Sequence, residues 1–320
     1  MTAAVSVIVP AYNAAGFVGR AIESVLAQTM QALEIIIIDD GSTDETLSVL
    51  RGYEKASPAV RIVELARNGG VAAARNAGMA AARGDWLAVL DADDAFAPER
   101  LAELVAFGAS TGADFVADDL AYYDAVAGIV TGSGMAFAPP GKPVSLREFL
   151  AHNLADGKGM DWGLLKPLFR RAAFAAGYPR YAENVSHGED FQLVIELLLA
   201  GADFRILARP LYLYTQRHGA VSGKASGLTR TSIAYGRLSE AALSLAQDPR
   251  IAGDAALVRL LHQRAQGLRR LDDAHFISVT LHAHQFGRLM ARARREPRLL
   301  VLTARQASRA LGRRLSGAIG

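Results

Sequence analysis

The sequence contains no cysteine, and this absence excludes both a disulfide framework and metal sites built from thiolates. It also has no apolar run of the ~18 residues that a membrane-spanning helix needs, so no such helix is predicted. The segment from Met1 to Val5 has no basic stretch before an apolar one and predicts no secretory signal. These absences predict a cytoplasmic protein that is soluble or attaches at most to a membrane surface.

Two phosphate-binding loops are missing after the first predicted strand, which covers Val5 to Val9. A nicotinamide-dependent dehydrogenase would have a Gly-x-Gly-x-x-Gly turn there, and a sugar-nucleotide pyrophosphorylase a glycine-rich loop with arginine and lysine. The chain has Ala11-Tyr12-Asn13-Ala14 instead. We therefore do not expect a dehydrogenase, and a pyrophosphorylase is the weaker of the alternatives considered below.

Positive charge is concentrated at the end of the chain. Nine arginines and one glutamate lie between Arg288 and Gly320, so the net charge of this segment is +8. The whole chain has a net charge of +3, so the preceding residues carry −5. The segment predicts a basic amphipathic helix, which can either bind an anionic membrane surface or pack on the protein's own core. Its two faces consist of Arg298, Arg305, Arg309 and Arg313, and of Leu300, Ala304, Ala307, Leu311 and Leu315.

Strand and helix patterns alternate through the first 120 residues. This alternation predicts an α/β fold with a doubly wound, mostly parallel sheet. Residues 119–160 predict a hairpin and loops around a helix at 145–153, and beyond 222–228 the pattern is helical. We predict a domain of residues 1–222 and a helical C-terminal region of residues 223–320. The expected strands are 5–9, 34–38, 61–65, 85–90, 113–118, 205–207 and 211–214, and the early helices are 16–30, a segment capped by Ser42 or Thr43 that ends near 53, 71–82 and 98–108.

Acidic residues occur where three apolar segments begin or end. Asp39-Asp40 follows four isoleucines, Asp91-Ala92-Asp93-Asp94 follows a second predicted strand, and Glu189-Asp190 opens an apolar helix. Ligands of open parallel sheets bind beyond the carboxyl ends of the strands. Carboxylates there can hold a divalent cation and the phosphates that it neutralises. Asp91 and Asp93 are two positions apart, so both side chains can face one ligand.

Several motifs occur in a fixed order along the chain. They are the strand that leads to Pro10-Ala11-Tyr12-Asn13, Asp39 to Asp44, Asn68-Gly69-Gly70 with Arg75-Asn76-Ala77-Gly78, Asp91 to Asp94, and Glu189-Asp190 after Lys166-Pro167-Leu168-Phe169-Arg170. This order resembles that of the family-2 glycosyltransferases of GT-A fold. The resemblance covers about residues 3–222, and within the family the chain is most similar to bacterial transferases of exopolysaccharide synthesis, the succinoglycan-type glucosyltransferases.

The resemblance implies roles for individual residues. Asp190 would be the catalytic base, with Glu189 beside it. A Mg²⁺ or Mn²⁺ ion would be bound by Asp93, with Asp91 and His218 as further candidates. The nucleotide would contact Pro10, Ala11, Tyr12, Asn13, Asp40, Asn68, Gly70, Asn76, Asp91 and Arg217.

Each of these residues also has a structural interpretation, and both stay open at this point. Asp40 can cap a turn, Asp91 and Asp93 can form a solvated acidic turn, and Glu189-Asp190 can favour a helix start. Asn76 can make a packing hydrogen bond. Arg217 and His218 can be exposed loop residues, and Trp162, a candidate platform for an acceptor sugar, can belong to the core.

The resemblance implies an inverting glycosyltransferase that uses a nucleotide donor, a UDP-sugar, and forms a β-glycosidic bond. Its acceptor would be a glycan or a lipid-linked saccharide, and the basic tail would allow peripheral contact with the inner face of the cytoplasmic membrane. No nucleic-acid partner is expected. The main alternative is a non-catalytic protein that binds sugar nucleotides or glycans.

Overall fold

The structure is a computed structural model that describes residues 3–135, 141–175, 177–184, 187–216 and 234–303. The chain forms two compact units. Unit 1 comprises residues 1–153 and 157–233, and unit 2 comprises residues 154–156 and 234–320. The predicted boundary at residues 222–228 lies outside the described residues, so its position stays a prediction.

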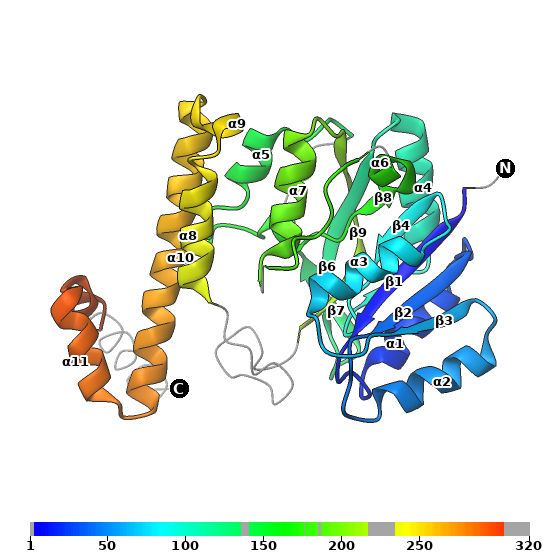
Figure 1. The fold of residues 1–320 in the computed structure, drawn as a ribbon, viewed down its shortest axis with the longest axis horizontal. Coiled ribbons are helices and arrows are strands. Elements are labelled where there is room, and N and C mark those ends of the chain that lie inside the picture. The colour runs from blue at the N-terminus through cyan, green and yellow to red at the C-terminus, as the bar shows by residue number, and fades with distance from the viewer. Residues whose placement is uncertain (1–2, 136–140, 176, 185–186, 217–233, 304–320) are drawn as a thin grey trace. The chain divides into compact units, whose positions relative to one another are not determined.

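The first half of the sheet in unit 1 is parallel, as predicted. Its strands are β1 (Val5–Ala11), β2 (Glu34–Asp39), β3 (Val60–Glu64) and β4 (Trp86–Val89), in the order β3-β2-β1-β4. Every residue of β1, β2 and β4 is buried, because helices cover both faces of these strands. Figure 1 shows α1 (Val18–Leu26) and α2 (Thr46–Ala56) on one side and α3 (Val71–Ala81) on the other.

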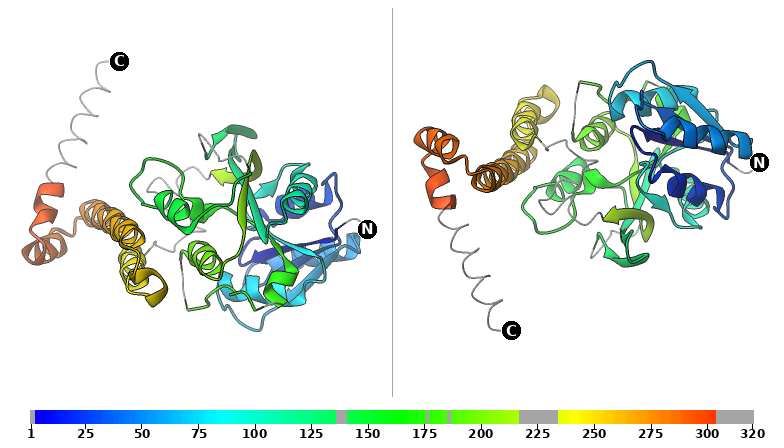
Figure 2. Two further views of the ribbon diagram at one scale, coloured as in Figure 1. Left: turned by 90° about the horizontal axis from the view of Figure 1, so that it is seen from above. Right: turned by 90° about the horizontal axis from the view of Figure 1, so that it is seen from below.

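The second half of the sheet is mixed and continues in the order β4-β8-β6-β9-β5. Its strands are β5 (Ala95–Phe96), β6 (Phe115–Asp124), β8 (Leu168–Arg170) and β9 (Phe204–Gln216), while β7 (Ile129–Ser133) pairs with β6 alone. β8 runs antiparallel to both neighbours, whereas β6 and β9 are parallel. Helix α4 (Arg100–Thr111) packs on β6 and β9, and Figure 2 shows from two further sides that helices flank this sheet. The predicted α/β class is therefore confirmed.

Strand β9 differs from the prediction of two short strands, because one strand spans the whole segment. Its pairing with β6 shifts around Asp119: Asp118 pairs with Leu207, Asp119 with Pro210 and Leu120 with Tyr212. The extra residues of β9 form a bulge that contains a proline, and proline interrupts the hydrogen bonding of a strand. This bulge explains why the pattern predicts two strands.

The start of α2 also differs from the prediction, in which Ser42 or Thr43 caps the helix. The helix begins at Thr46, and the carboxylate of Asp44 accepts a hydrogen bond from the Thr46 backbone N–H at 2.9 Å. Ser42 instead accepts one from the backbone N–H of Asn13 at 3.0 Å. The helix begins three to four residues after Ser42 and Thr43, so neither residue is at the position from which a side chain caps a helix.

The chain between β7 and β9 contains short helices and then a long one. They are α5 (Leu146–Ala151), the 3-10 helix η1 (Trp162–Leu164), α6 (Arg171–Ala175) and α7 (Glu189–Leu199). Trp162 is 2% exposed, and its ring stacks on that of His152 with the centroids 3.9 Å apart. The structure thus places Trp162 in the core, which leaves it little surface for an acceptor sugar.

Unit 2 is helical, as predicted, with α8 (Tyr235–Leu245), α9 (Pro249–Ala252), α10 (Ala255–His282) and α11 (Phe286–Arg295). Leu289 and Ala293 of α11 pack with Ile277 and Leu299 in a small buried cluster. Most of the predicted basic tail helix lies beyond residue 303 and outside the described residues. Among the residues that are described, no helix is both long and apolar enough to cross a membrane.

Candidate active site

The carboxyl ends of β1 and β2 are joined by hydrogen bonds between their following loops. Tyr12 is exposed at the end of β1, and the next residue, Asn13, adopts a left-handed conformation with φ of 49°. Its side-chain oxygen accepts a hydrogen bond from the backbone N–H of Thr43 at 2.8 Å. The segment from Pro10 to Asn13 is therefore held beside the loop that follows β2, with the Tyr12 ring available to a ligand.

Asp40 connects the end of β2 to the loop before α3. Its two carboxylate oxygens accept hydrogen bonds from the backbone N–H groups of Gly69 at 2.7 Å and Gly70 at 2.9 Å. Burial raises the pKa of Asp40 despite these bonds. Gly70 has φ of 86°, a conformation that favours glycine, so the turn formed by Asn68-Gly69-Gly70 uses the backbone freedom of this residue. A carboxylate can accept about four hydrogen bonds, so Asp40 could accept others besides those from Gly69 and Gly70. Its role in nucleotide binding stays a prediction.

Helix α3 approaches β1 closely because it has a glycine at the contact. A methyl group at Gly78 would lie 2.3 Å from Cγ2 of Ile8, well inside van der Waals contact. Its neighbour Asn76 donates to the carbonyl of Tyr181 at 2.8 Å and accepts from the Tyr181 N–H at 3.1 Å. The structure thus shows the packing interaction of Asn76, and a contact with nucleotide stays a prediction.

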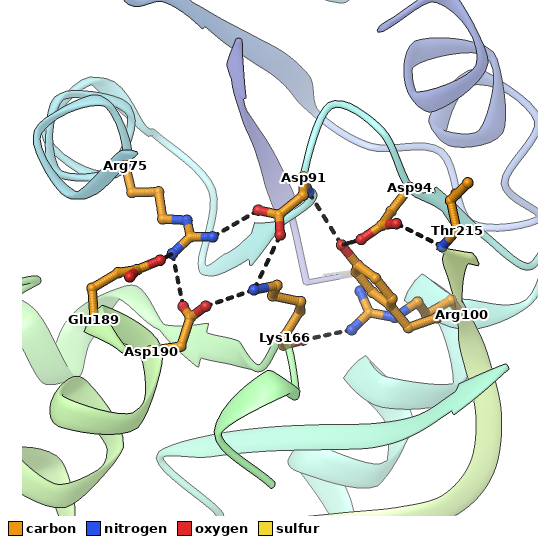
Figure 3. A network of polar contacts seen from close by, with 9 residues as sticks. Arg75, Asp91, Asp94, Arg100, Lys166, Glu189, Asp190 and Thr215 are labelled. Carbon is orange, nitrogen blue, oxygen red and sulfur yellow. Dashed lines mark hydrogen bonds and ion pairs between the residues drawn. The ribbon is translucent and has the colours of Figure 1, made fainter. Parts of the chain in front are cut away.

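Arg75 is the centre of the site, and its side chain is 2% exposed. Its guanidinium lies 2.7 Å from Asp91, 2.9 Å from Glu189 and 2.8 Å from Asp190 (Figure 3). The ring of Tyr181 packs against this group, 5.1 Å from its central carbon. One arginine on α3 therefore joins the end of β4 to the start of α7.

Lys166 also joins the end of β4 to the start of α7. Its ammonium lies 2.6 Å from Asp190 and 3.1 Å from Asp91 (Figure 3). Burial opposes the charge of Lys166, but Asp190 and Asp91 outweigh it and raise the pKa of this ammonium above its ordinary value. Burial likewise opposes the charge of Asp91, yet Lys166 and Arg75 hold the pKa of Asp91 far below its ordinary value. Asp91 and Asp190 are thus linked through two shared cations.

Strand β9 fixes the acidic turn that follows β4. The Tyr212 hydroxyl donates to Asp94 at 2.8 Å and accepts from the backbone N–H of Asp91 at 3.2 Å. The backbone N–H of Thr215 donates to Asp94 at 2.8 Å, and the Thr215 hydroxyl donates to the carbonyl of Asp93 at 2.5 Å. Burial, followed by repulsion from Asp93 and Asp91, raises the pKa of Asp94 to about 8.

The structure places some of the predicted site residues together and leaves others untested. The structure brings together Asp91, Glu189 and Asp190, and it places Tyr12, Asn13 and Asp40 at the neighbouring strand ends. Arg217 and His218 lie outside the described residues. Within the described ranges, no three or more histidine, aspartate or glutamate side chains form a metal-binding group. The roles of Asp93, Asp91 and His218 as metal ligands stay predictions.

The sequence does not predict that Lys166, Tyr212 and Thr215 hold the acidic residues of the site in place. Lys166 appears in the sequence analysis only as part of a family motif. A lysine between Leu165 and Leu168-Phe169 is, however, a signal of its own, because lysine is rarely buried without a partner. Tyr212 and Thr215 give no comparable signal, since the bulge in β9 determines which way their side chains point.

The comparisons with known proteins agree with this geometry. The model of glycosyl transferase family 2 matches residues 6–172. The chain belongs to this family. Succinoglycan biosynthesis protein ExoU of Rhizobium meliloti (strain 1021) is 35% identical over 309 residues, which cover 94% of this chain and 86% of ExoU. ExoO of the same organism is 31% identical over 224 residues, which cover 68% of this chain and 62% of ExoO.

The solved structures show that this family-2 chain has the GT-A fold. S. aureus TarS 1-349 in complex with UDP-GlcNAc superimposes with a TM-score of 0.62 at 22% identity, covering 81% of this chain and 72% of that one. The mannosyltransferase PcManGT from Pyrobaculum calidifontis, in complex with GDP-Man and Mn²⁺, gives a TM-score of 0.53 at 19% identity, covering 96% and 85%. At these identities the likeness shows the fold alone.

Proposed function

We propose that this chain is an inverting glycosyltransferase that moves a sugar from a UDP-sugar to a glycan or a lipid-linked saccharide and forms a β-glycosidic bond. The observation that carries the proposal is the pair of cations, Arg75 and Lys166, that hold Asp91 and Asp190 side by side. Asp91 belongs to the acidic turn where the donor diphosphate is expected. Asp190 lies at the start of α7, where a base for the acceptor is expected.

In the proposed reaction, the acceptor hydroxyl oxygen attacks the anomeric carbon from the face opposite the diphosphate. The bond to the diphosphate breaks, and Asp190 takes the hydroxyl proton. Glu189, which shares the guanidinium of Arg75 with Asp190, orients the base or contacts the acceptor. The exposed ring of Tyr12 and the carboxylate of Asp40 serve the nucleobase, together with the other nucleotide-binding residues predicted above.

We expect a divalent cation at the acidic turn. Carboxylate oxygens are the ligands that Mg²⁺ and Mn²⁺ prefer. Burial, followed by repulsion from Asp93 and Asp91, raises the pKa of Asp94 to about 8, and a cation beside these carboxylates would relieve the repulsion. Asp93 would hold the ion, with Asp91 and His218 as further candidates. When bound, it would neutralise negative charge on the departing nucleoside diphosphate.

The similarity to ExoU, a succinoglycan biosynthesis protein, supports a role in bacterial exopolysaccharide or cell-surface glycan synthesis. TarS was solved with UDP-GlcNAc, and PcManGT was solved with GDP-Man and Mn²⁺, which supports a nucleotide-sugar donor and a divalent metal here. A lipid-linked acceptor would be found at a membrane, and the basic segment from Arg288 onward would hold the enzyme at the inner face of the cytoplasmic membrane.

A donor screen tests this proposal. Purified protein is incubated with UDP-, GDP- and TDP-sugars and with Mn²⁺, Mg²⁺ or EDTA, and release of the nucleotide is measured with and without candidate acceptors. We expect release from a UDP-sugar that needs the metal and an acceptor. Metal-dependent UDP binding without release from any donor would instead support the non-catalytic alternative. Release that is equally fast in EDTA would contradict the metal assignment.

A further inference from the structure

Arg100 and Asp118 form a fully buried ion pair behind the site, and both side chains are 0% exposed. Arg100 begins α4, and Asp118 lies on β6 where the pairing with β9 shifts. The guanidinium donates through Nε to both carboxylate oxygens, at 3.0 and 3.1 Å, and through Nη2 to one of them at 2.7 Å. Neither side chain can touch a substrate, so the proposed reaction does not use them directly.

The same guanidinium reaches the site in two ways. Its Nη2 donates a hydrogen bond to the backbone carbonyl of Lys166 at 2.6 Å (Figure 3). It also lies between two rings, with its central carbon 4.2 Å from the centroid of Phe96 and 5.1 Å from that of Tyr212. Lys166 binds Asp91 and Asp190, whereas Tyr212 binds Asp94 and the backbone of Asp91. Arg100 therefore supports two of the residues that hold the acidic turn.

We propose that Arg100, held by Asp118, is a positioning residue that fixes Lys166 against Asp91 and Asp190 and fixes Tyr212 against the acidic turn. The predicted effect of Arg100 on the rate of sugar transfer depends on the proposed function. Its predicted effect on the position of Lys166 does not. A buried ion pair adds little net stability compared with apolar groups of the same volume. Positioning of the site gives a reason for Arg100 and Asp118 that stability alone does not supply.

A double substitution separates positioning from stability. Replacing Arg100 alone would leave the buried carboxylate of Asp118 without its cation, and the protein could then unfold. Arg100→Met/Asp118→Leu removes both charges and keeps the apolar volume, so this variant is expected to stay folded. It loses the hydrogen bond to Lys166 and the cation over Tyr212. Its melting temperature is measured first to confirm that it is folded.

The expected effect is on turnover and not on donor affinity. Small displacements of catalytic groups cost about 10- to 100-fold in rate, so kcat should fall by about that factor, with KM for the donor changed by less than about threefold. In the background of a second variant, Lys166→Met, the double substitution should cost less in kcat, since the part of its effect that acts through Lys166 is already lost and only the part through Tyr212 remains. Fully additive losses would contradict the proposal.

A spectroscopic readout tests the inference without turnover. The sequence has only five lysines, so the side-chain ammonium resonance of Lys166 can be assigned by comparison with Lys166→Arg. We expect this resonance to shift or broaden in Arg100→Met/Asp118→Leu. The control is Glu34→Gln, which removes a buried carboxylate at the start of β2 and should leave both the resonance and kcat unchanged.

The two proposals fail in different ways. A folded double variant with unchanged kcat and an unchanged Lys166 resonance would overturn the positioning role of Arg100. An unaltered protein that turns over no donor would overturn the proposed function. In that case the Lys166 resonance would still decide whether Arg100 positions this side chain.

Discussion

Nη1 of Arg75 lies 2.8 Å from a carboxylate oxygen of Asp190, although 115 residues separate the two in sequence. The contact joins α3 to α7, and the same nitrogen lies 2.9 Å from Glu189. Three carboxylates share this buried guanidinium, so it neutralises charge that would otherwise repel. Both the stability of the fold and the activity of the site should therefore depend on Arg75.

Removing the cation of Arg75 should be costly. We expect Arg75→Gln to lower the free energy of unfolding by about 3–5 kcal/mol, because it leaves buried carboxylates without their partner. Urea unfolding at pH 7 measures this loss. The control is Arg51→Gln, which breaks exposed ion pairs with Glu54 and Glu64 and should cost far less stability, because water screens such pairs. Equal losses in the two variants would contradict the central position of Arg75.

Asp190→Asn tests the base directly. The amide cannot accept the proton of an acceptor hydroxyl, so kcat should fall by more than about 100-fold while binding of UDP with Mn²⁺ is kept. Turnover kinetics and calorimetry measure the two quantities. The matched control is Glu99→Gln, an exposed carboxylate at the start of α4, for which no change in kcat is expected. An Asp190→Asn variant with normal kcat would show that another group acts as the base.

The contact between α3 and β1 can be tested with two glycines. Gly78→Ala places a methyl group 2.3 Å from Ile8, and overpacking of this kind costs about 1–3 kcal/mol. Gly52→Ala in α2 meets no atom within 4 Å, and alanine is the better helix former by about 1 kcal/mol. Thermal unfolding should therefore show a lower melting temperature for the first variant and a higher one for the second. The same sign of change in both would contradict the packing shown here.

Glu34 makes the stability depend on pH. It accepts hydrogen bonds from Ser6 at 2.7 Å and from the backbone of Arg83 at 2.8 Å; burial opposes its charge, but these bonds outweigh burial and lower its pKa below the ordinary value of 4.5. Ionised Glu34 therefore stabilises the fold above about pH 4.5, and this contribution is lost as the pH falls through the lowered pKa. Glu34→Gln should be less stable than the unaltered protein at pH 7, and the difference should shrink toward pH 3. A difference that is independent of pH would refute this.

The basic segment should bind anionic vesicles. Arg288, Arg294 and Arg295 of α11 are each expected to add about 1 kcal/mol near an anionic lipid, so replacing all three by glutamine should weaken binding roughly 100-fold. We prefer these substitutions to a truncation of the chain after Ala283. The truncation would also remove the buried contacts of Leu289 and Ala293 with Ile277 and could change binding for that reason. Co-sedimentation with anionic and neutral vesicles measures the effect. Binding of the unaltered protein that is equal on both kinds of vesicle would exclude the electrostatic contact.

The parallel half of the fold could be predicted from sequence because its signals are local. Four isoleucines before Asp39-Asp40 form a strand that is buried on both faces, and the next acidic turn follows a second such strand. The mixed half could not be predicted in the same way. β5 has two residues and β8 has three, too few to show a period, and their pairing depends on strands far away in the sequence.

The site was predictable as a set of carboxylates but not as a network. Their types and places at strand ends could be recognised one by one, whereas the pairing of Arg75 and Lys166 with them could not. Arg75 binds Asp190 across 115 residues, and Lys166 binds both Asp190 and Asp91 from a third part of the chain, so no local pattern specifies these pairings. The bulge in β9 likewise determines the direction of Tyr212 only after β6 and β9 have paired.

The place of β8 in the sheet sets an order for assembly of the protein during its synthesis. β8 lies between β4 and β6, although both of those strands precede it in the chain. A nascent chain that ends before Leu168 therefore has two separate pieces of sheet, each with an open edge that invites pairing with other chains. We expect these edges to be open to pairing with other chains until residue 170 has been added. Only after that can Lys166 and α7 complete the site.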